Sequence, residues 1–232
     1  MNLPQSIESI ARTSLHEELV ERIQDLIIQG SLRSGAKVPE KDLCVRFGVS
    51  RTPMREALKV LAADGLVVLE PNRGAWVREI TLDELEEVFP VLGALEALAG
   101  ELACQNIADE TVETVKAVHI EMEEHFKNRN RQEYFKSNQL IHEIILEASG
   151  NATLVAQHRS LSKRLRQARY LSNMEEDRWR QAVDEHRLML AALERRAGAE
   201  LGKILNQHLN NKFGVVRQRL IDEEKSVAQT GK

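Results

Sequence analysis

The stretch at residues 49–58, VSRTPMREAL, constrains the fold of this chain more than any other. Gly48 stands where a short amphipathic helix ends, and glycine readily takes the left-handed conformation of a helix C-cap. Ser50 is suited to the N-cap of the next helix, and Pro53 falls in its first turn, where the missing N–H removes no hydrogen bond. The sequence therefore predicts two helices joined by a tight turn.

The second of these helices has two chemically different sides. Its apolar side is formed at helical spacing by Met54, Ala57, Leu58 and Leu61. The rest of its surface carries Arg51, Thr52, Arg55 and Lys59. This outward surface can meet phosphates and base edges while the apolar side packs in a core.

Two short β-prone runs follow Gly65, at residues 66–70 and 75–78. The Pro-Asn-Arg-Gly sequence between them is typical of a turn. We therefore expect a β-hairpin directly after the second helix. A helix-turn-helix followed by a hairpin is the arrangement of a winged helix.

The charge around these helices favours nucleic acid. Residues 31–60 hold seven Lys and Arg against three Asp and Glu, a local balance of +4. In docked helix-turn-helix domains, the first residues of the second helix reach base edges in the major groove. Arginine suits guanine there, since its fork pairs with two acceptors and contributes roughly 1 to 3 kcal/mol of discrimination. We expect binding to double-stranded DNA; the alternative is a small solvated helical hairpin whose charges carry no function.

Composition divides the chain into unlike parts. Its 232 residues suit one large domain or two smaller ones, and 29% charged with only 4% aromatic residues favours helices. The first 79 residues carry eleven basic and eleven acidic side chains, so the net charge of -4 belongs to the remainder, which has 21 basic against 25 acidic. That acidic part is not expected to bind DNA by itself.

No export signal or membrane segment is visible in the sequence. The first residues lack a basic start followed by an apolar run, and no stretch approaches 18 consecutive apolar residues. We expect a soluble, cytoplasmic protein with no membrane partner.

Hydrophobic periodicity sets the expected domain limits. We expect a DNA-binding domain at 14–79, a helical domain at 82–224, and flexible tails at 1–13 and 225–232. The helical domain has no convincing strand, and its expected helices fall at 82–106, 109–128, 131–148, 152–171, 174–196 and 199–224. The predicted fold is mainly α, with an N-terminal winged helix-turn-helix, a small β-hairpin wing, and a C-terminal all-α, antiparallel six-helix bundle.

Three histidines interrupt apolar stripes of the predicted bundle, namely His142, His186 and His208. Asn138 stands one helical turn before His142, so these two side chains lie side by side. Burying such groups costs roughly 1 to 3 kcal/mol apiece unless each finds a partner. A shared metal ion would satisfy all of them, because neutral imidazoles bind zinc, nickel and similar ions and an amide oxygen can add a weaker bond. The alternative for each histidine is a hydrogen-bonded core residue.

The N-terminal pattern P-E-x-x-L-x-x-x-F-G-V-S-R-T-P-x-R-E-A-L, followed by Gly-Leu-Val and P-N-R-G-A-x-V, resembles the DNA-binding domain of GntR-type bacterial transcription regulators. The resemblance implies DNA contacts through Lys41, Ser50, Arg51, Thr52 and Arg55, with Gly74 at the tip of the wing. Arg33 is expected to contact phosphate only.

The second domain resembles the helical FCD ligand-binding domain of the FadR subfamily. The matching residues are Asn138-x-x-x-His142 followed by Ala-Ser-Gly-Asn, then Glu185-His186, then His208-Leu209. In metal-binding members of this group, an Asp and three His hold a divalent ion. The resemblance therefore implies a metal site at Asn138, His142, His186 and His208.

Two departures from that pattern bear on the ligand. Asn138 stands where those members most often have Asp, so the site loses a negative charge and should hold metal more weakly. With a dication it would keep a charge near +2 and favour an anion. Leu92 precedes Glu96 where the family commonly has an Arg, so a clamp for a ligand carboxylate is missing. Arg169 is a candidate substitute for effector binding; the alternative is a surface arginine.

These observations predict a homodimeric transcriptional repressor that reads a palindromic operator and binds zinc or nickel together with a small carboxylate metabolite. Two rivals remain open: a direct metal-sensing regulator, and a metal-dependent hydrolase or isomerase. The hydrolase would need a general base beside the metal. Glu143 and Glu185 adjoin expected ligands in sequence and so project about 100° away around their helices.

Overall fold

The computed structural model describes residues 15–165 and 176–230, and it divides into two compact units, Met1–Arg78 and Glu79–Lys232. Each unit has its own apolar core. The expected tail at 1–13 lies outside the described residues. Within the described ranges, no helix combines the length and apolarity needed to cross a bilayer.

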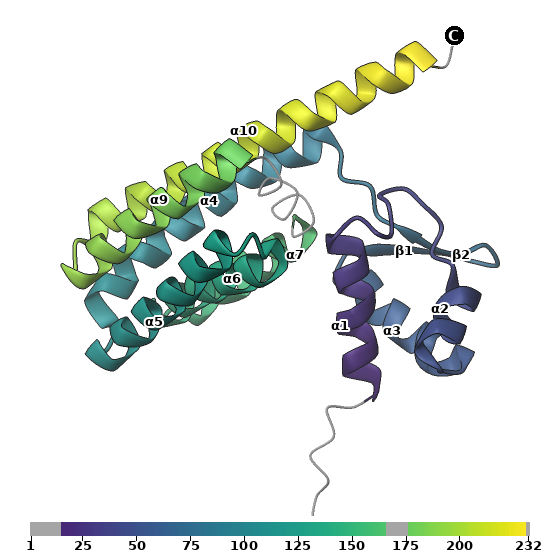
Figure 1. The fold of residues 1–232 in the computed structure, drawn as a ribbon, viewed down its shortest axis with the longest axis horizontal. Coiled ribbons are helices and arrows are strands. Elements are labelled where there is room, and N and C mark those ends of the chain that lie inside the picture. The colour runs from purple at the N-terminus through teal and green to yellow at the C-terminus, as the bar shows by residue number, and fades with distance from the viewer. Residues whose placement is uncertain (1–14, 166–175, 231–232) are drawn as a thin grey trace, which may run out of the picture. The chain divides into compact units, whose positions relative to one another are not determined.

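The first unit contains three helices followed by a two-stranded sheet (Figure 1). Its elements are α1 (Leu15–Ile28), α2 (Glu40–Phe47), α3 (Arg51–Ala63), β1 (Val67–Glu70) and β2 (Gly74–Val77). The apolar side of α3 is buried as expected, with Met54 and Leu61 at 0% exposure. Helix α1 packs against α3 and contributes Ile23 and Ile27 to the same core. The predicted helix-turn-helix is confirmed.

The turn between α2 and α3 depends on Gly48. This residue takes the left-handed conformation, with a φ of 67°, and its N–H reaches the carbonyl oxygens of Cys44 and Val45. Ser50 occupies the N-cap position in extended backbone, but its side chain makes no capping hydrogen bond. The position was predicted correctly, whereas the expected side-chain cap does not form.

The hairpin is antiparallel, with Val67 opposite Val77 and Glu70 opposite Gly74. Val67 and Val77 are buried in the core of the first unit, and the alternation of buried and partly exposed residues along β2 fixes the register of the sheet. Asn72 in the turn has a φ of 62° and Gly74 has a φ of 99°, values that asparagine and glycine tolerate best. The predicted wing is confirmed; β1 begins one residue later than expected, and β2 lies one residue earlier than expected.

The second unit is helical throughout its described residues (Figure 1). Its helices are α4 (Leu82–Asn106), α5 (Asp109–Lys127), α6 (Arg131–Ala148), α7 (Ala152–Arg164), α9 (Glu176–Glu194) and α10 (Gly198–Thr230). Helix α10 packs along α4 and beside α9, while α5 packs on α6 and α7 covers part of α4. A capping interaction starts α4, because Thr81 Oγ1 accepts a hydrogen bond from the N–H of Glu84 at 3.2 Å.

Helices α10 and α7 differ most from the prediction, whereas α5 and α9 end only one and two residues early. Helix α10 continues to Thr230, so the expected tail at 225–232 is helical over most of its length. The Glu, Lys, Ala and Gln residues there are good helix formers, and this propensity had been given too little weight. Helix α7 ends at Arg164 rather than at 171, and the rest of that expected helix, with Arg169, lies outside the described residues.

Glycines allow α4 and α10 to approach closely. A Cβ added to Gly202 would lie 2.8 Å from the carbonyl oxygen of Ala97, and one added to Gly100 would lie 2.7 Å from Leu205 Cδ1. A side chain at Gly202 would require the helix backbones to separate, whereas one at Gly100 would require Leu205 to move. Helix α4 carries Glu96, and α10 carries His208 and Lys212. These three residues belong to one buried polar centre, so the contact between the two helices also affects the geometry of that centre.

Substitution of Gly202 by Ala should destabilise the protein by about 1 to 3 kcal/mol, since backbone atoms of α4 must move to admit the methyl group. Gly214→Ala is the matched control, because no atom lies within 4 Å of an added Cβ on the same helix. That control should be neutral or stabilising by roughly 0.5 to 1 kcal/mol. Urea unfolding followed by circular dichroism measures both; equal destabilisation by the two substitutions would contradict the close-packing argument.

Candidate functional site

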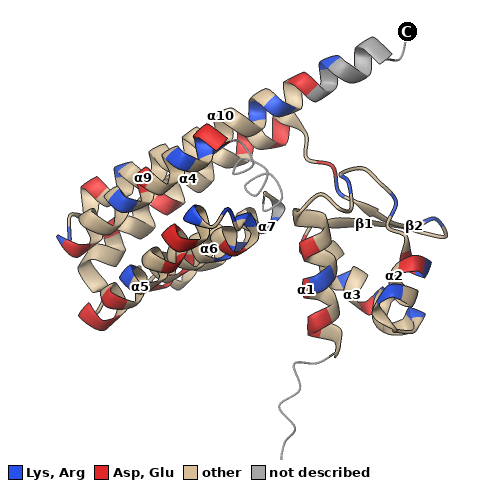
Figure 2. Ribbon diagram, viewed as in Figure 1, with Lys and Arg blue, Asp and Glu red and all other residues tan. Residues whose placement is uncertain are grey.

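The start of α3 presents a polar surface on the first unit. Arg51, Thr52 and Arg55 are exposed there, while Met54 and Ala57 between them are buried. Lys and Arg residues on α2, on α3 and in the hairpin turn are visible in Figure 2. This surface has the composition that contact with phosphates and base edges requires.

The other expected DNA contacts are also at the surface. Arg33, Lys41 and Ser50 are exposed, and Gly74 begins β2. A Cβ added to Gly74 would lie 3.3 Å from Glu40 Oε1 at the start of α2. The turn end of the hairpin therefore packs against the first residue of α2. The roles of the expected contact residues in DNA binding stay predictions.

Two basic side chains that were not among the expected DNA contacts lie beside Trp76 of the hairpin. Lys37 Nζ lies 5.8 Å from the centroid of the Trp76 ring, and the Arg73 guanidinium lies 6.0 Å from it. Arg73 also pairs with Glu70 at 2.8 Å. The aromatic ring and these contacts hold two cations beside the wing.

The second unit brings together the three predicted histidines from three helices. His142 comes from α6, His186 from α9 and His208 from α10, and one possible ligand atom from each lies within 4.8 Å of the others. Their ring centroids are 4.9 to 5.2 Å apart, and exposure ranges from 0% to 6%. We call these three residues the histidine cluster. Its members are close enough to share one ion after small side-chain movements.

Asn138 joins the histidine cluster as expected from its position one turn before His142. Its Nδ2 atom lies 2.5 Å from His186 Nε2, and its Oδ1 atom accepts a hydrogen bond from Lys212 Nζ at 3.4 Å. Asn138 is 0% exposed, so these contacts replace those with water. The amide oxygen that would bind a metal therefore faces a lysine.

Two carboxylates orient the histidines. Glu185 Oε2 lies 2.5 Å from His208 Nδ1, and Glu96 Oε2 lies 3.3 Å from His142 Nδ1. A carboxylate on Nδ1 holds the proton there and leaves Nε2 as the nitrogen able to bind a metal. His208 Nε2 is buried without a hydrogen-bond partner, as this arrangement requires.

The contact made by Glu185 corrects the sequence argument about this residue. Glu185 does project away from His186 on its own helix, but it reaches His208 on the neighbouring helix α10. Its other oxygen accepts a hydrogen bond from Asn211 at 2.6 Å. Glu185 thus supports a histidine, rather than standing apart from the cluster as spacing along a single helix suggested.

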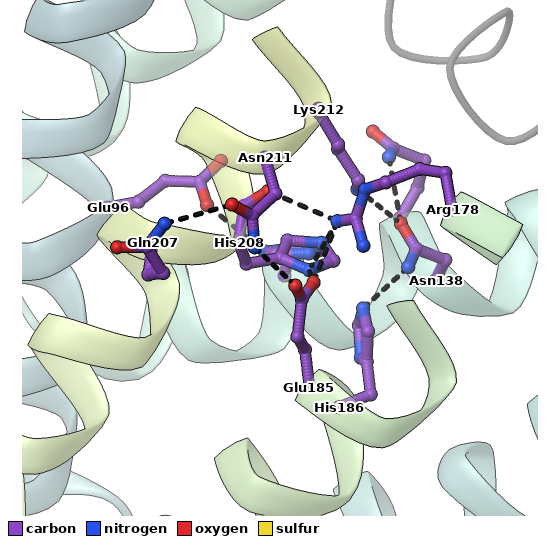
Figure 3. A network of polar contacts seen from close by, with 11 residues as sticks. Glu96, Asn138, Arg178, Glu185, His186, Gln207, His208, Asn211 and Lys212 are labelled. Atoms are coloured by element: carbon purple, nitrogen blue, oxygen red, sulfur yellow. Dashed lines mark hydrogen bonds and ion pairs between the residues drawn. The ribbon is translucent and has the colours of Figure 1, made fainter. Parts of the chain in front are cut away.

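Two buried cations adjoin the histidine cluster, and the sequence analysis missed both (Figure 3). Arg178 donates to Glu185 Oε2 at 2.7 Å and to the carbonyl oxygen of His208 at 3.2 Å. Lys212 is 0% exposed and stands four residues after His208 on α10. The four-residue spacing could have indicated Lys212, since residues i and i+4 share a helix face.

Burial favours the neutral form of the His186 and His208 imidazoles. It is the largest cause that holds the pKa of His186 well below its usual range, followed by the neighbouring His142 and His119 rings. Burial and then the positive charge of Lys212 lower the pKa of His208 in the same way. Neutral imidazole is the form that binds a metal ion.

Two histidines without a predicted role lie next to the cluster. His158 Nε2 is 3.2 Å from Glu96 Oε1, so Glu96 lies between His158 and His142. The His119 ring centroid is 5.4 Å from that of His186, and burial lowers the pKa of His119. Both residues are buried and extend the polar centre beyond the four predicted positions.

Two cavities reach this polar centre from outside. One of about 370 Å³ lies between α6 and α7 and is lined by His142 and His158, among others. A larger one of about 920 Å³ lies between α9 and α10 and is lined by Arg178 and Asn211, among others. These cavities offer space for a small ligand beside the histidine cluster. The smaller cavity is lined by His142 of the cluster, and the larger by Arg178, which contacts His208.

Comparison with known proteins matches this architecture in both units. Residues 15–77 match the family described as bacterial regulatory proteins, gntR family, and residues 87–211 match the FCD domain. The class defined by the two domains is therefore a DNA-binding transcriptional regulator with a helical FCD domain. The chain belongs to the GntR family of bacterial regulators and carries an FCD domain, as the sequence patterns predicted.

Named relatives agree with this assignment. A probable D-xylose utilization operon transcriptional repressor from Paenarthrobacter nicotinovorans is 32% identical over 63% of this chain and 64% of its own length. The gluconate operon transcriptional repressor of Bacillus licheniformis is 25% identical over 93% of this chain and 90% of its own length. The relatives and both domains are those of regulators, not enzymes, so the hydrolase alternative is not supported.

A solved structure shares the fold. Escherichia coli McbR/YncC superimposes with a TM-score of 0.78 at 20% identity, covering 90% of this chain and 100% of that one. At this identity the likeness extends to the fold alone.

Two substitutions in the first unit should have different effects on DNA binding. Arg51→Ala should reduce the free-energy discrimination between bases at one operator position by roughly 1 to 3 kcal/mol, because a base-edge contact is lost. Lys41→Ala should weaken binding to all sequences, because a phosphate contact is lost. The slope of the logarithm of the binding constant against the logarithm of salt concentration should fall in magnitude by about one. Duplexes selected from a random pool and titrated at several salt concentrations measure both effects.

Lys203→Ala, which makes the same charge change at an exposed position of α10, is the control and should match the wild type. Selected sequences and salt slopes unchanged by Arg51→Ala and Lys41→Ala would exclude the expected contacts.

The metal-free protein should lose stability as the pH falls below about 6.5. His119, His186 and His208 have folded-state pKa values below the usual value of 6.5, so the unfolded chain takes up protons first on acidification. In that range, each histidine lowers the free energy of unfolding by up to about 1.4 kcal/mol for each pH unit of acidification. Urea unfolding of chelator-treated protein should therefore show a fall of about 2 kcal/mol or more between pH 7 and pH 5.5.

The interval from pH 7 to pH 8 is the internal control, because these histidines are neutral there in both states. Constant stability from pH 8 down to pH 5.5 would show that the imidazoles are not held neutral by burial.

Proposed function

We propose that this regulator is a homodimeric repressor of a palindromic operator whose FCD domain binds one divalent metal ion together with a small carboxylate effector. Zinc and nickel suit the available ligands, three imidazole nitrogens and an amide oxygen. The proposal rests chiefly on one observation, the convergence of three buried histidines from separate helices within 4.8 Å.

The donor set fits a metal ion in its chemistry. His142 and His208 each contact a carboxylate through Nδ1, as metal-binding histidines commonly do. The buried, unpartnered Nε2 of His208 would gain a bond from an ion. The metal would supply a Lewis-acid contact for an anion, while the side chains of this chain orient the ligands and exclude water.

Charge balance supports an anionic effector. The buried side chains of Arg178 and Lys212 are balanced by those of Glu96 and Glu185, so a dication would leave the centre near +2. A carboxylate would reduce that excess and fill coordination positions left by the protein. The named relatives control operons for gluconate and D-xylose utilisation, which supports a small metabolite as the regulating molecule.

The effector would act on DNA binding by changing the equilibrium between two arrangements of the dimer. It can shift that equilibrium only by its difference in affinity for the two arrangements. A two-fold dimer would read half-sites about one helical turn of DNA apart or a multiple of it.

Metal content per chain tests this function. Protein purified without a histidine tag or chelator should carry about one equivalent of zinc or nickel by mass spectrometry, since one cluster holds one ion. His186→Ala should carry almost none, whereas His125→Ala, outside the cluster, should match the wild type. Absence of metal from all three proteins, even after incubation with zinc or nickel, would exclude the metal site.

A change in operator affinity caused by physiological metal alone would favour the direct metal sensor over the carboxylate-responsive repressor. Operator titrations with metal-loaded and metal-free wild-type protein make this distinction.

A further inference from the structure

The connection between α1 and α2 adds a third short segment to the small sheet of the first unit. The N–H of Val38 donates to the carbonyl oxygen of Ala75 at 2.8 Å, and the last residue of β2 donates in turn to the residue before Lys37 at 2.8 Å. Lys37 thereby stands opposite Trp76 in an antiparallel bridge. Residues 36–38 are therefore held along β2 by backbone hydrogen bonds.

Alternation along these strands places Lys37 and Trp76 together on the outer face of the sheet. Val38 and Ala75 are at most 1% exposed and belong to the core, whereas Lys37 is exposed and Trp76 is partly exposed. Successive side chains of a strand point to opposite faces, so the lysine and the ring share the face turned away from the core. Lys37 Nζ lies 5.8 Å from the centroid of the Trp76 ring, within the range of cation–π attraction. The ring thus restricts the lysine while its side chain stays exposed.

Lys37 lies next to the surface that is expected to meet DNA. A Cβ added to Gly74, the expected wing contact, would lie 3.4 Å from Lys37 Cε and 3.3 Å from Glu40 Oε1. Glu40 Oε2 lies in turn 4.0 Å from Arg55 Nε on the exposed side of α3. Lys37, Gly74, Glu40 and Arg55 therefore follow one another across one surface. A duplex that meets both α3 and Gly74 comes within reach of the lysine.

The charge of Lys37 is available to a phosphate. Lys37 forms no ion pair with any residue that the structure describes, whereas Arg73 pairs with Glu70 at 2.8 Å. A lysine ammonium is a compact charge that binds phosphate oxygens without reading base edges. Such a contact increases affinity and salt dependence for every sequence alike.

We propose that Lys37, positioned by the ring of Trp76, binds a backbone phosphate of the operator beside the wing. The contact extends the DNA-binding surface to the connection between α1 and α2, outside the helix-turn-helix and the hairpin turn. The inference rests on the operator binding of the proposed function and adds a phosphate site to it. Trp76 is a positioning residue, because it acts through the lysine.

The test titrates full-length protein with a duplex that the wild type selects from a random pool, at several salt concentrations. Lys37→Ala should weaken binding about fivefold at roughly 0.15 M salt, because one phosphate contact is lost. The slope of the logarithm of the binding constant against the logarithm of salt concentration should fall in magnitude by about one. Base preferences should stay those of the wild type, since a phosphate carries no sequence information. Lys37→Arg keeps the charge and should bind like the wild type.

A second set of variants tests the role of the ring. Trp76→Leu should weaken binding about two- to threefold, because the lysine loses the contact that orders it. Trp76→Phe keeps an aromatic ring and should lose less. In the Lys37→Ala background, Trp76→Leu should cause no further loss, and this coupling distinguishes positioning of the lysine from support of the hairpin. Urea unfolding followed by circular dichroism checks that each variant is folded.

Lys203→Ala removes the same charge from an exposed position of α10 and should match the wild type. Wild-type affinity and salt slope in Lys37→Ala would overturn the phosphate contact, as would a loss of base discrimination in place of a uniform loss. Equal effects of Trp76→Leu with and without Lys37 would overturn the positioning role of the ring. Failure of the wild type to select any duplex would instead overturn operator binding, and this inference with it.

Discussion

The close contact between α4 and α10 determines the geometry of the helical unit. Gly202 leaves no room for a side chain beside the α4 backbone, and Gly100 packs against Leu205, so the two helices approach each other closely. Helix α4 carries Glu96, and α10 carries His208 and Lys212. A small displacement at the crossing would therefore change distances among the carboxylate, imidazole and ammonium groups that form the polar centre.

That centre places charged and polar side chains where an apolar core would be more stable. Its cost is reduced by mutual contacts, such as those of Glu185 with Arg178 and His208. Burial and nearby positive charge both oppose protonation of His186 and His208. A ligand that completes the remaining bonds gains free energy from them, and an effector shifts an equilibrium when this gain differs between the two states.

The first unit was predictable nearly in full, because its determinants are local. Gly48 and Pro53 set the turn and the helix start, and the apolar spacing of α3 follows from one turn of helix to the next. The expected helical extent of α10 was too short, since helix propensity continues the helix beyond the limit that apolar periodicity indicated. Such errors fall at helix ends, where competing local preferences are nearly balanced.

By itself, the sequence determined the family, the two domains and the residue types of the candidate metal site. The pairing of Asn138 with His142 follows from helical spacing alone. Only the tertiary structure placed Glu185 on His208 and Lys212 on Asn138, contacts between residues 23 and 74 positions apart. Periodicity specifies the face of a helix on which a residue lies, but it does not specify which neighbouring helix that face will meet or at what height along it.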